Sequence, residues 1–147
     1  MIKDILNAFR AQDPQKLDKD DARIALATLM VRIARTDGDY AQIEIATIDA
    51  ILSKRFNLDA DKALALRKQA EELETEAPDN VRFTRIIKDA VPYEDRASVV
   101  EALWSVVLSD GKRDDDEHGF MRLVASLLGV NDRDSAFARQ RALKAAS

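Results

Sequence analysis

The chain has 147 residues and a net charge of −4, because 23 Lys and Arg residues oppose 27 Asp and Glu residues. This acidic balance argues against nucleic acid as the main partner, since binding to phosphates needs a surplus of cationic side chains. The chain has no cysteine and one histidine, which excludes disulfides and thiolate metal sites and removes most zinc-enzyme arrangements. With no apolar run near the roughly 20 residues that cross a bilayer, and no signal-peptide pattern, we expect a cytoplasmic protein without a membrane span.

Apolar residues recur every three or four positions along the chain, which predicts an all-α fold. The Asp-Gly pairs, the prolines and Gly129 divide it into seven to eight helices joined by short links. We expect a single helical domain over residues 1–147, with its core in about 20–143 and an N-terminal helix and linker in 1–17. The predicted helices cover residues 2–10, 20–36, 41–56, 60–74, 80–90, 92–108, 114–129 and 132–145.

Three residues have specific expected roles in these helices. Asp59 precedes the fourth of them and is a typical N-cap residue. Pro92 is expected in a first helical turn, where the missing N–H leaves no helical hydrogen bond unmade. Trp104 lies on the apolar face of its helix, so we expect it in the core and not in a ligand site.

An internal repeat is centred on two Asp-Gly pairs. Residues 24–56 align with residues 97–129 at an offset of 73. An apolar helix precedes each Asp-Gly pair, and an amphipathic helix follows it. The alignment predicts a bundle with an internal helix–Asp-Gly–helix duplication, whose two helix pairs are related by an approximate two-fold axis. The matched residues are Asp37 with Asp110, Gly38 with Gly111 and Glu44 with Glu117.

Each Asp-Gly corner gathers oxygen donors. Its aspartate lies at the C-terminal end of a helix, where the dipole disfavours a carboxylate by about 0.3–1 kcal/mol and backbone carbonyls are unpaired. A glutamate seven residues later begins the next helix and can fold back over the corner. Carboxylate and carbonyl oxygens are the ligands that Ca²⁺ and Mg²⁺ take, so a duplicated site should bring both sets of carboxylates together. The predicted metal ligands are Asp37, Asp39, Glu44, Asp110, Asp114 and Glu117.

Other interpretations of these corners stay open. Asp-Gly is a common turn pair, and glutamate in a first helical turn is an ordinary capping residue. Arg35, Lys112 and Arg113 are close enough in sequence to neutralise the aspartates without a metal. In a second interpretation, the chain is a protein-interaction module whose acidic corners contact a basic partner. A metal-dependent hydrolase is a third, and it would need a pocket beside the acids.

We expect no catalytic residue and no organic cofactor. His118 adjoins Glu117, but neighbouring helical residues point about 100° apart, so the two do not share a face. The serines lack a second histidine for a relay, and the four glycines are isolated and form no phosphate-binding loop.

The two corner sequences resemble the twin acidic signature of the TerB-like family, which includes the tellurite-resistance protein TerB and the N-terminal domain of a DnaJ-like co-chaperone. They are RTDGDYAQIE over residues 35–44 and LSDGKRDDDE over residues 108–117. The resemblance covers about residues 20–143. It implies about seven helices with an internal duplication, an acidic site for divalent cations and no enzymatic activity. We therefore expect a non-enzymatic module in a stress response of the tellurite-resistance type, with a protein partner as the alternative role of its corners.

By this resemblance, the functional residues carried over are those that match the signature in both copies. The sequence also departs from the family pattern at three positions. Thr36 and Ser109 stand where the family usually has Ala, and Ala41 stands where the first motif often has a capping Ser or Asp. The carried-over residues are Asp37 and Glu44 from the first motif and Asp110 and Glu117 from the second.

Overall fold

A computed structural model of the chain describes residues 19–36, 40, 42–76, 80–109 and 115–146. These residues form seven helices and no strand, which confirms the predicted all-α class. The helix predicted over residues 2–10 lies outside the described residues. The helices are α2 (Lys19–Arg35), α3 (Gln42–Phe56), α4 (Ala60–Glu76), α5 (Asn80–Ala90), α6 (Tyr93–Val107), α7 (Asp115–Leu127) and α8 (Asp132–Ala146).

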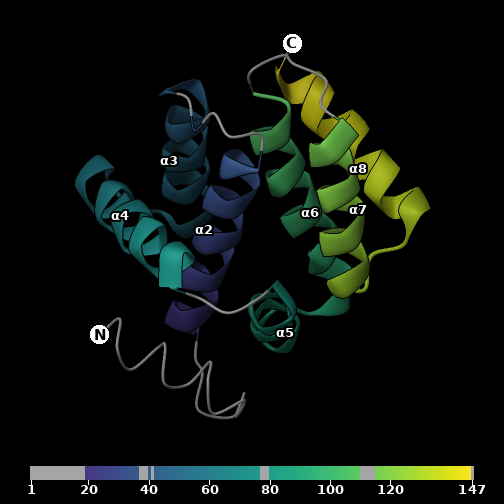
Figure 1. The fold of residues 1–147 in the computed structure, drawn as a ribbon, viewed down its shortest axis with the longest axis horizontal. Helices are drawn as coiled ribbons and strands as arrows, with labels where there is room; N and C mark the ends of the chain where they lie inside the picture. Colours follow the sequence, from purple (N-terminus) through teal and green to yellow (C-terminus); the bar gives the residue numbers. More distant parts are fainter. Residues whose placement is uncertain (1–18, 37–39, 41, 77–79, 110–114, 147) are drawn as a thin grey trace.

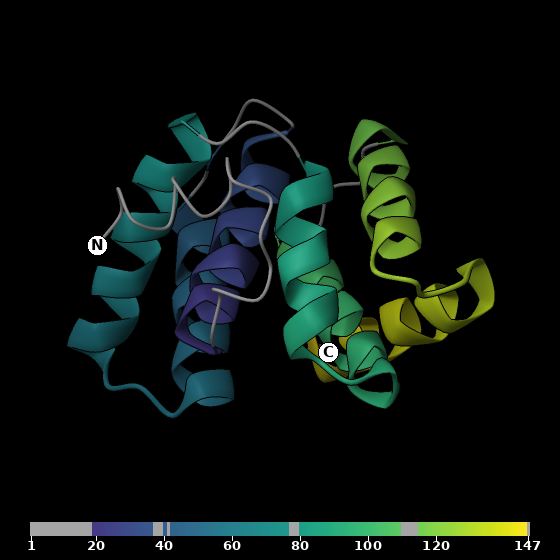
Figure 2. The same cartoon turned by 90° about the horizontal axis from the view of Figure 1, so that it is seen from below.

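Helices α2 and α6 lie side by side in the middle of the molecule (Figure 1). Helices α3 and α4 lie on one side of this pair, and α7 and α8 lie on the other. Figure 1 shows α5 end-on, whereas Figure 2 shows it along its length, so α5 runs across the central helices. Every other helix except α8 packs against α2, while α8 packs mainly against α6.

The core forms around α2, which is buried on nearly all sides. Its residues from Ile24 to Val31 are all buried, as are Ile33 and Ala34. A helix that is apolar all round is expected at the centre of a domain, and burying one leucine such as Leu29 stabilises the fold by about 1.5–3 kcal/mol. Trp104 is in the core as predicted, where its Nε1 donates to Ser135 Oγ at 3.1 Å.

The helix ends follow local sequence signals. The Asp59 carboxylate accepts a hydrogen bond from the Lys62 backbone N–H at 2.8 Å, which confirms the predicted N-cap of α4. Gly129 has φ of +78°, and the Val130 N–H donates to the Ala125 carbonyl at 2.9 Å, the pattern of a glycine-terminated helix. Pro92 precedes α6 instead of lying in its first turn, because its ψ of 153° is extended.

The described ends of the duplicated helix pairs lie at one end of the molecule. In Figure 1, α2 and α6 both run upward, whereas α3 and α7 both run downward. The C-terminal ends of α2 and α6 and the N-terminal ends of α3 and α7 therefore lie at the same end of the molecule, which we call the motif end. The two Asp-Gly corners themselves lie outside the described residues.

Candidate functional site

Glu44 is the one predicted metal ligand whose side chain the structure describes. It lies in the first turn of α3, at the motif end, with only 1% of its surface exposed. Glutamate is almost never fully buried unless it is paired, and Glu44 does take part in an interaction. The clustering of carboxylates from both copies stays a prediction. Outside the description are Asp37, Asp39, Asp110 and Asp114 and the side chain of Glu117.

A network of charged side chains joins α4 to α3 beside the first motif. Arg67 of α4 is at its centre, and its side chain is only 9% exposed. Its Nε donates to Asp49 Oδ1 at 2.6 Å, and its Nη1 donates to Glu71 Oε2 at 2.8 Å. Hydrogen bonds between charged groups are about twice as strong as those between neutral groups, and the planar guanidinium restricts their geometry. Arg67 therefore fixes the position of α3 on α4.

Tyr40 brings the segment between α2 and α3 into this network. Its hydroxyl donates to Glu71 Oε2 at 2.7 Å, and the guanidinium of Arg35 lies 5.0 Å from the centre of its ring. Burial, followed by the hydrogen bond to Glu71 and the charge of Glu71, raises the pKa of the Tyr40 hydroxyl well above its ordinary value. Tyr40 thus stays a hydrogen-bond donor at neutral pH.

Glu71 stays ionised because its neighbours favour the charged form of its carboxyl group. Burial alone would raise its pKa, but the hydrogen bonds from Tyr40 and Arg67, with the charges of Arg67 and Arg35, lower the pKa below its ordinary value. A carboxylate that accepts several hydrogen bonds prefers its charged form. The protonated Tyr40 and the ionised Glu71 therefore hold each other in the states that their hydrogen bond needs.

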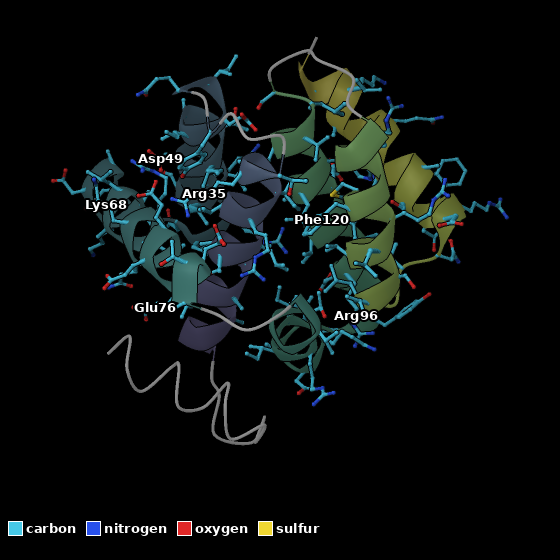
Figure 3. All side chains as sticks on the ribbon, in the orientation of Figure 1. Arg35, Asp49, Lys68, Glu76, Arg96 and Phe120 are labelled. Carbon is cyan, nitrogen blue, oxygen red and sulfur yellow. The ribbon has the colours of Figure 1, made fainter. Side chains whose placement is uncertain are left out.

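Two arginines attach the last turn of α2 to α4. The Nη1 of Arg35 lies 2.8 Å from Glu74 Oε1, and the Nη2 of Arg32 donates to the Glu74 backbone carbonyl at 3.1 Å. Cations are favourable at a helix C-terminus, so these contacts stabilise the helix end that leads into the first motif. In Figure 3, Arg35 and Asp49 lie beside α4 from two different helices. We call this set the Arg67 network; it comprises Arg32, Arg35, Tyr40, Asp49, Arg67, Glu71 and Glu74.

Sequence reasoning missed the Arg67 network, although one signal was present. Arg67 stands four residues after Ala63 and three before Ala70, so it occupies the buried face of α4. An arginine among small buried residues indicates a paired charge. The sequence offers Arg35 as a partner for the aspartates of the first motif, whereas among the described residues its guanidinium pairs with Glu74.

A comparison with protein families places the chain in one of them. The model described as "Tellurite resistance protein TerB" matches residues 23–140, which run from the first turns of α2 through most of α8 and include both Asp-Gly motifs. The chain belongs to the TerB family. The resemblance inferred from the two motifs is thereby confirmed. Comparisons with curated proteins and with solved structures give no match.

Two further findings concern the part of this TerB-family chain that the structure describes. Within it, no group of three or more His, Cys, Asp and Glu side chains lies close enough to hold a metal ion. None of its helices is long and apolar enough to cross a membrane. The buried Glu44 and the Arg67 network are therefore the described features that bear on the motif end.

Proposed function

We propose that this TerB-family protein is a non-enzymatic module whose two Asp-Gly corners bind a divalent cation, Ca²⁺ or Mg²⁺, in a tellurite-type stress response. The observation that carries the proposal is that four helix ends lie at the motif end (Figure 1). These ends belong to α2, α3, α6 and α7, and each adjoins one of the duplicated motifs. The proposed ligands are Asp37, Asp39, Glu44, Asp110, Asp114 and Glu117.

The chemistry of the donor set supports a hard cation. All six proposed ligands are carboxylates, and the C-terminal ends of α2 and α6 add backbone carbonyl oxygens. Oxygen donors of these two kinds suit Ca²⁺ and Mg²⁺. The burial of Glu44 also supports the proposal, because burial strengthens the attraction between a carboxylate and a cation.

The Arg67 network supports the proposal in a different way. It anchors the end of α2 through Arg35 and the body of α3 through Asp49, so the two helices that flank the first motif are held on one support, α4. A binding site needs ligands placed on elements that do not shift. The proposed cation would bind carboxylates whose flanking helices, α2 and α3, are already held in place by α4.

Calorimetric titration of the full chain with CaCl₂ and with MgCl₂ tests the proposal. We expect saturable heat for wild type and its loss in the double variant Asp37→Asn/Asp110→Asn. The matched control is Asp61→Asn, since Asp61 is an exposed carboxylate in the first turn of α4, and it should bind as wild type does. Absence of saturable heat in wild type would contradict the proposal.

The same variants separate the metal site from a protein-interaction site. An acidic surface without a metal would bind a basic peptide such as oligolysine, and this binding would be lost in the double variant and weakened by salt. If oligolysine binds and neither cation does, the corners recognise a basic partner. The cytoplasmic location expected from the sequence stays a prediction.

A further inference from the structure

A cavity of about 190 Å³ lies between α2, α3, α5 and α6. Seven of its nine lining residues are apolar, among them Leu26, Phe56, Ile87 and Val99, and the other two are Arg23 and Arg55. An apolar cavity of about 150 Å³ is large enough to hold a benzene molecule. This cavity therefore has room for a small apolar group with an anionic end at the arginines.

The cavity is separate from the motif end. Phe56 is the last residue of α3, and Arg23 lies near the start of α2, at the ends of these helices that are remote from the first Asp-Gly corner. Arg35 follows Arg23 by twelve positions, which corresponds to about 18 Å along α2. A ligand in the cavity would not contact the proposed cation site.

The two arginines have no carboxylate bound to them among the described residues. Within the part of the chain that the structure describes, neither of them forms an ion pair with an Asp or Glu side chain. Arg55 donates from Nη1 to the Ser98 hydroxyl at 2.9 Å, and Arg23 stacks over the Phe56 ring at 5.1 Å. Arg67, by contrast, is held by two carboxylates.

A partly buried arginine that forms no ion pair with the described residues keeps N–H donors for a ligand. Burial lowers the pKa of the Arg55 guanidinium, and the charge of Asp95 opposes this only in part. A guanidinium has five N–H donors and binds a planar carboxylate through two of them at once. The apolar wall and the cationic side chains thus match the two ends of an amphipathic anion.

From this arrangement we infer that the cavity binds a small organic carboxylate, with its aromatic or short aliphatic group against Leu26, Ile87 and Val99 and its carboxylate at Arg23 and Arg55. The apolar group contributes burial, at about 25 cal/mol per Å² of surface removed from water. The carboxylate contributes orientation, because Arg23 and Arg55 are the two cationic side chains among the lining residues.

Titration of the full chain with sodium hexanoate and sodium benzoate, followed by calorimetry, tests the inference. Hexan-1-ol and benzyl alcohol are the matched neutral probes. We expect saturable one-to-one binding of at least one acid and at least tenfold weaker binding of its alcohol. Equal binding of acid and alcohol, or no saturable binding of either acid, would overturn the inference.

Four variants test the assignment of the residues. Arg55→Met should weaken binding of the acid at least tenfold, and Arg55→Lys should restore part of it. Ala22→Phe, which fills the cavity without changing charge, should abolish binding. Arg85→Met is the control, because Arg85 is exposed on α5 and does not line the cavity. If Arg55→Met and Ala22→Phe, each shown folded by circular dichroism, bind as wild type does, the site is wrong.

Discussion

Arg67 carries a buried positive charge that two carboxylates offset. Replacing it with methionine would leave Asp49 and Glu71 close together without their cation, while the apolar part of the side chain would be kept. The carboxylates are 32% and 22% exposed, so water would compensate part of the loss. We expect Arg67→Met to lower the free energy of unfolding by about 2 kcal/mol, measured by urea denaturation.

The neighbouring residue provides a matched control for this prediction. Lys68 is exposed, and its label in Figure 3 lies on the outer side of α4. Lys68→Met removes the same formal charge from the same helix and should change stability by no more than about 0.5 kcal/mol. Equal losses in the two variants would mean that the Arg67 contacts add nothing to stability.

The raised pKa of the Tyr40 hydroxyl predicts that the protein becomes less stable at alkaline pH. Its pKa is raised in the folded protein above the ordinary value of 10.0, so above pH 10 the unfolded chain loses the proton while the folded chain keeps it. The stabilisation is complete below pH 10 and is lost as the pH rises further. We expect the free energy of unfolding of wild type to fall there by up to about 1.4 kcal/mol per pH unit. The decrease should be smaller than this limit, because the ring is partly exposed to solvent.

Comparing two tyrosine variants isolates this effect from other groups that titrate in the same range. Tyr40→Phe should flatten the dependence of unfolding free energy on pH between pH 9.5 and pH 11, as followed by urea denaturation. Tyr93→Phe is the control, because the Tyr93 side chain is 60% exposed, and it should keep the wild-type slope. An unchanged slope in Tyr40→Phe would show that this hydroxyl does not act as described.

At the scale of elements, replacing either of two glycines of the α7 region with alanine should change the stability of the protein, in opposite directions. Gly129 ends the helix with φ of +78°, and an added Cβ would meet its neighbours no closer than 3.5 Å, so the cost of Gly129→Ala is backbone strain of about 1–2 kcal/mol. Gly119 lies inside α7 with open space around its Cβ position, so Gly119→Ala should stabilise by about 0.5–1 kcal/mol. Thermal unfolding measures both effects. Shifts of the same sign would contradict the backbone conformations described for these two glycines.

The elements could be predicted because their signals are local. The Asp59 cap, the Gly129 helix end and the apolar face around Trp104 each depend on a few residues that are close in sequence. The end of α3 at Phe56 was predicted, but the way the chain leaves the helix was found only in the structure: Asn57 adopts φ of 54°, which lets the Leu58 N–H donate to the Ser53 carbonyl at 2.9 Å. Asparagine tolerates this conformation, so the signal was present but weak.

The candidate site was less predictable because its contacts join distant segments. Glutamate in a first helical turn normally faces solvent, and the burial of Glu44 depends on how other helices pack around α3. The pairing of Arg67 with Asp49 depends in the same way on the register of α4 against α3. Pattern and spacing identify which residues are unusual, but the packing of helices decides which of them meet.

At the scale of the whole molecule, the duplication places two acidic motifs in one chain. Both helix pairs bring their motif-side ends to the same end of the bundle, so the two aspartates of the Asp-Gly pairs are proposed to share one cation (Figure 1). Carboxylates a few ångströms apart repel one another when no cation is bound. A cation that binds only the folded chain adds about 2.7 kcal/mol of stability at a hundredfold excess over its dissociation constant.

The melting temperature of wild type and of Asp37→Asn/Asp110→Asn, with and without Ca²⁺ or Mg²⁺, tests this claim most directly. Asparagine keeps the side-chain shape and removes the charge, so the double variant should melt higher than wild type without metal. Saturating metal should raise the melting temperature of wild type by roughly 8 °C and leave the variant unchanged. If wild type does not respond to either ion and the variant is less stable without metal, the aspartates are structural and the proposed cation site is wrong.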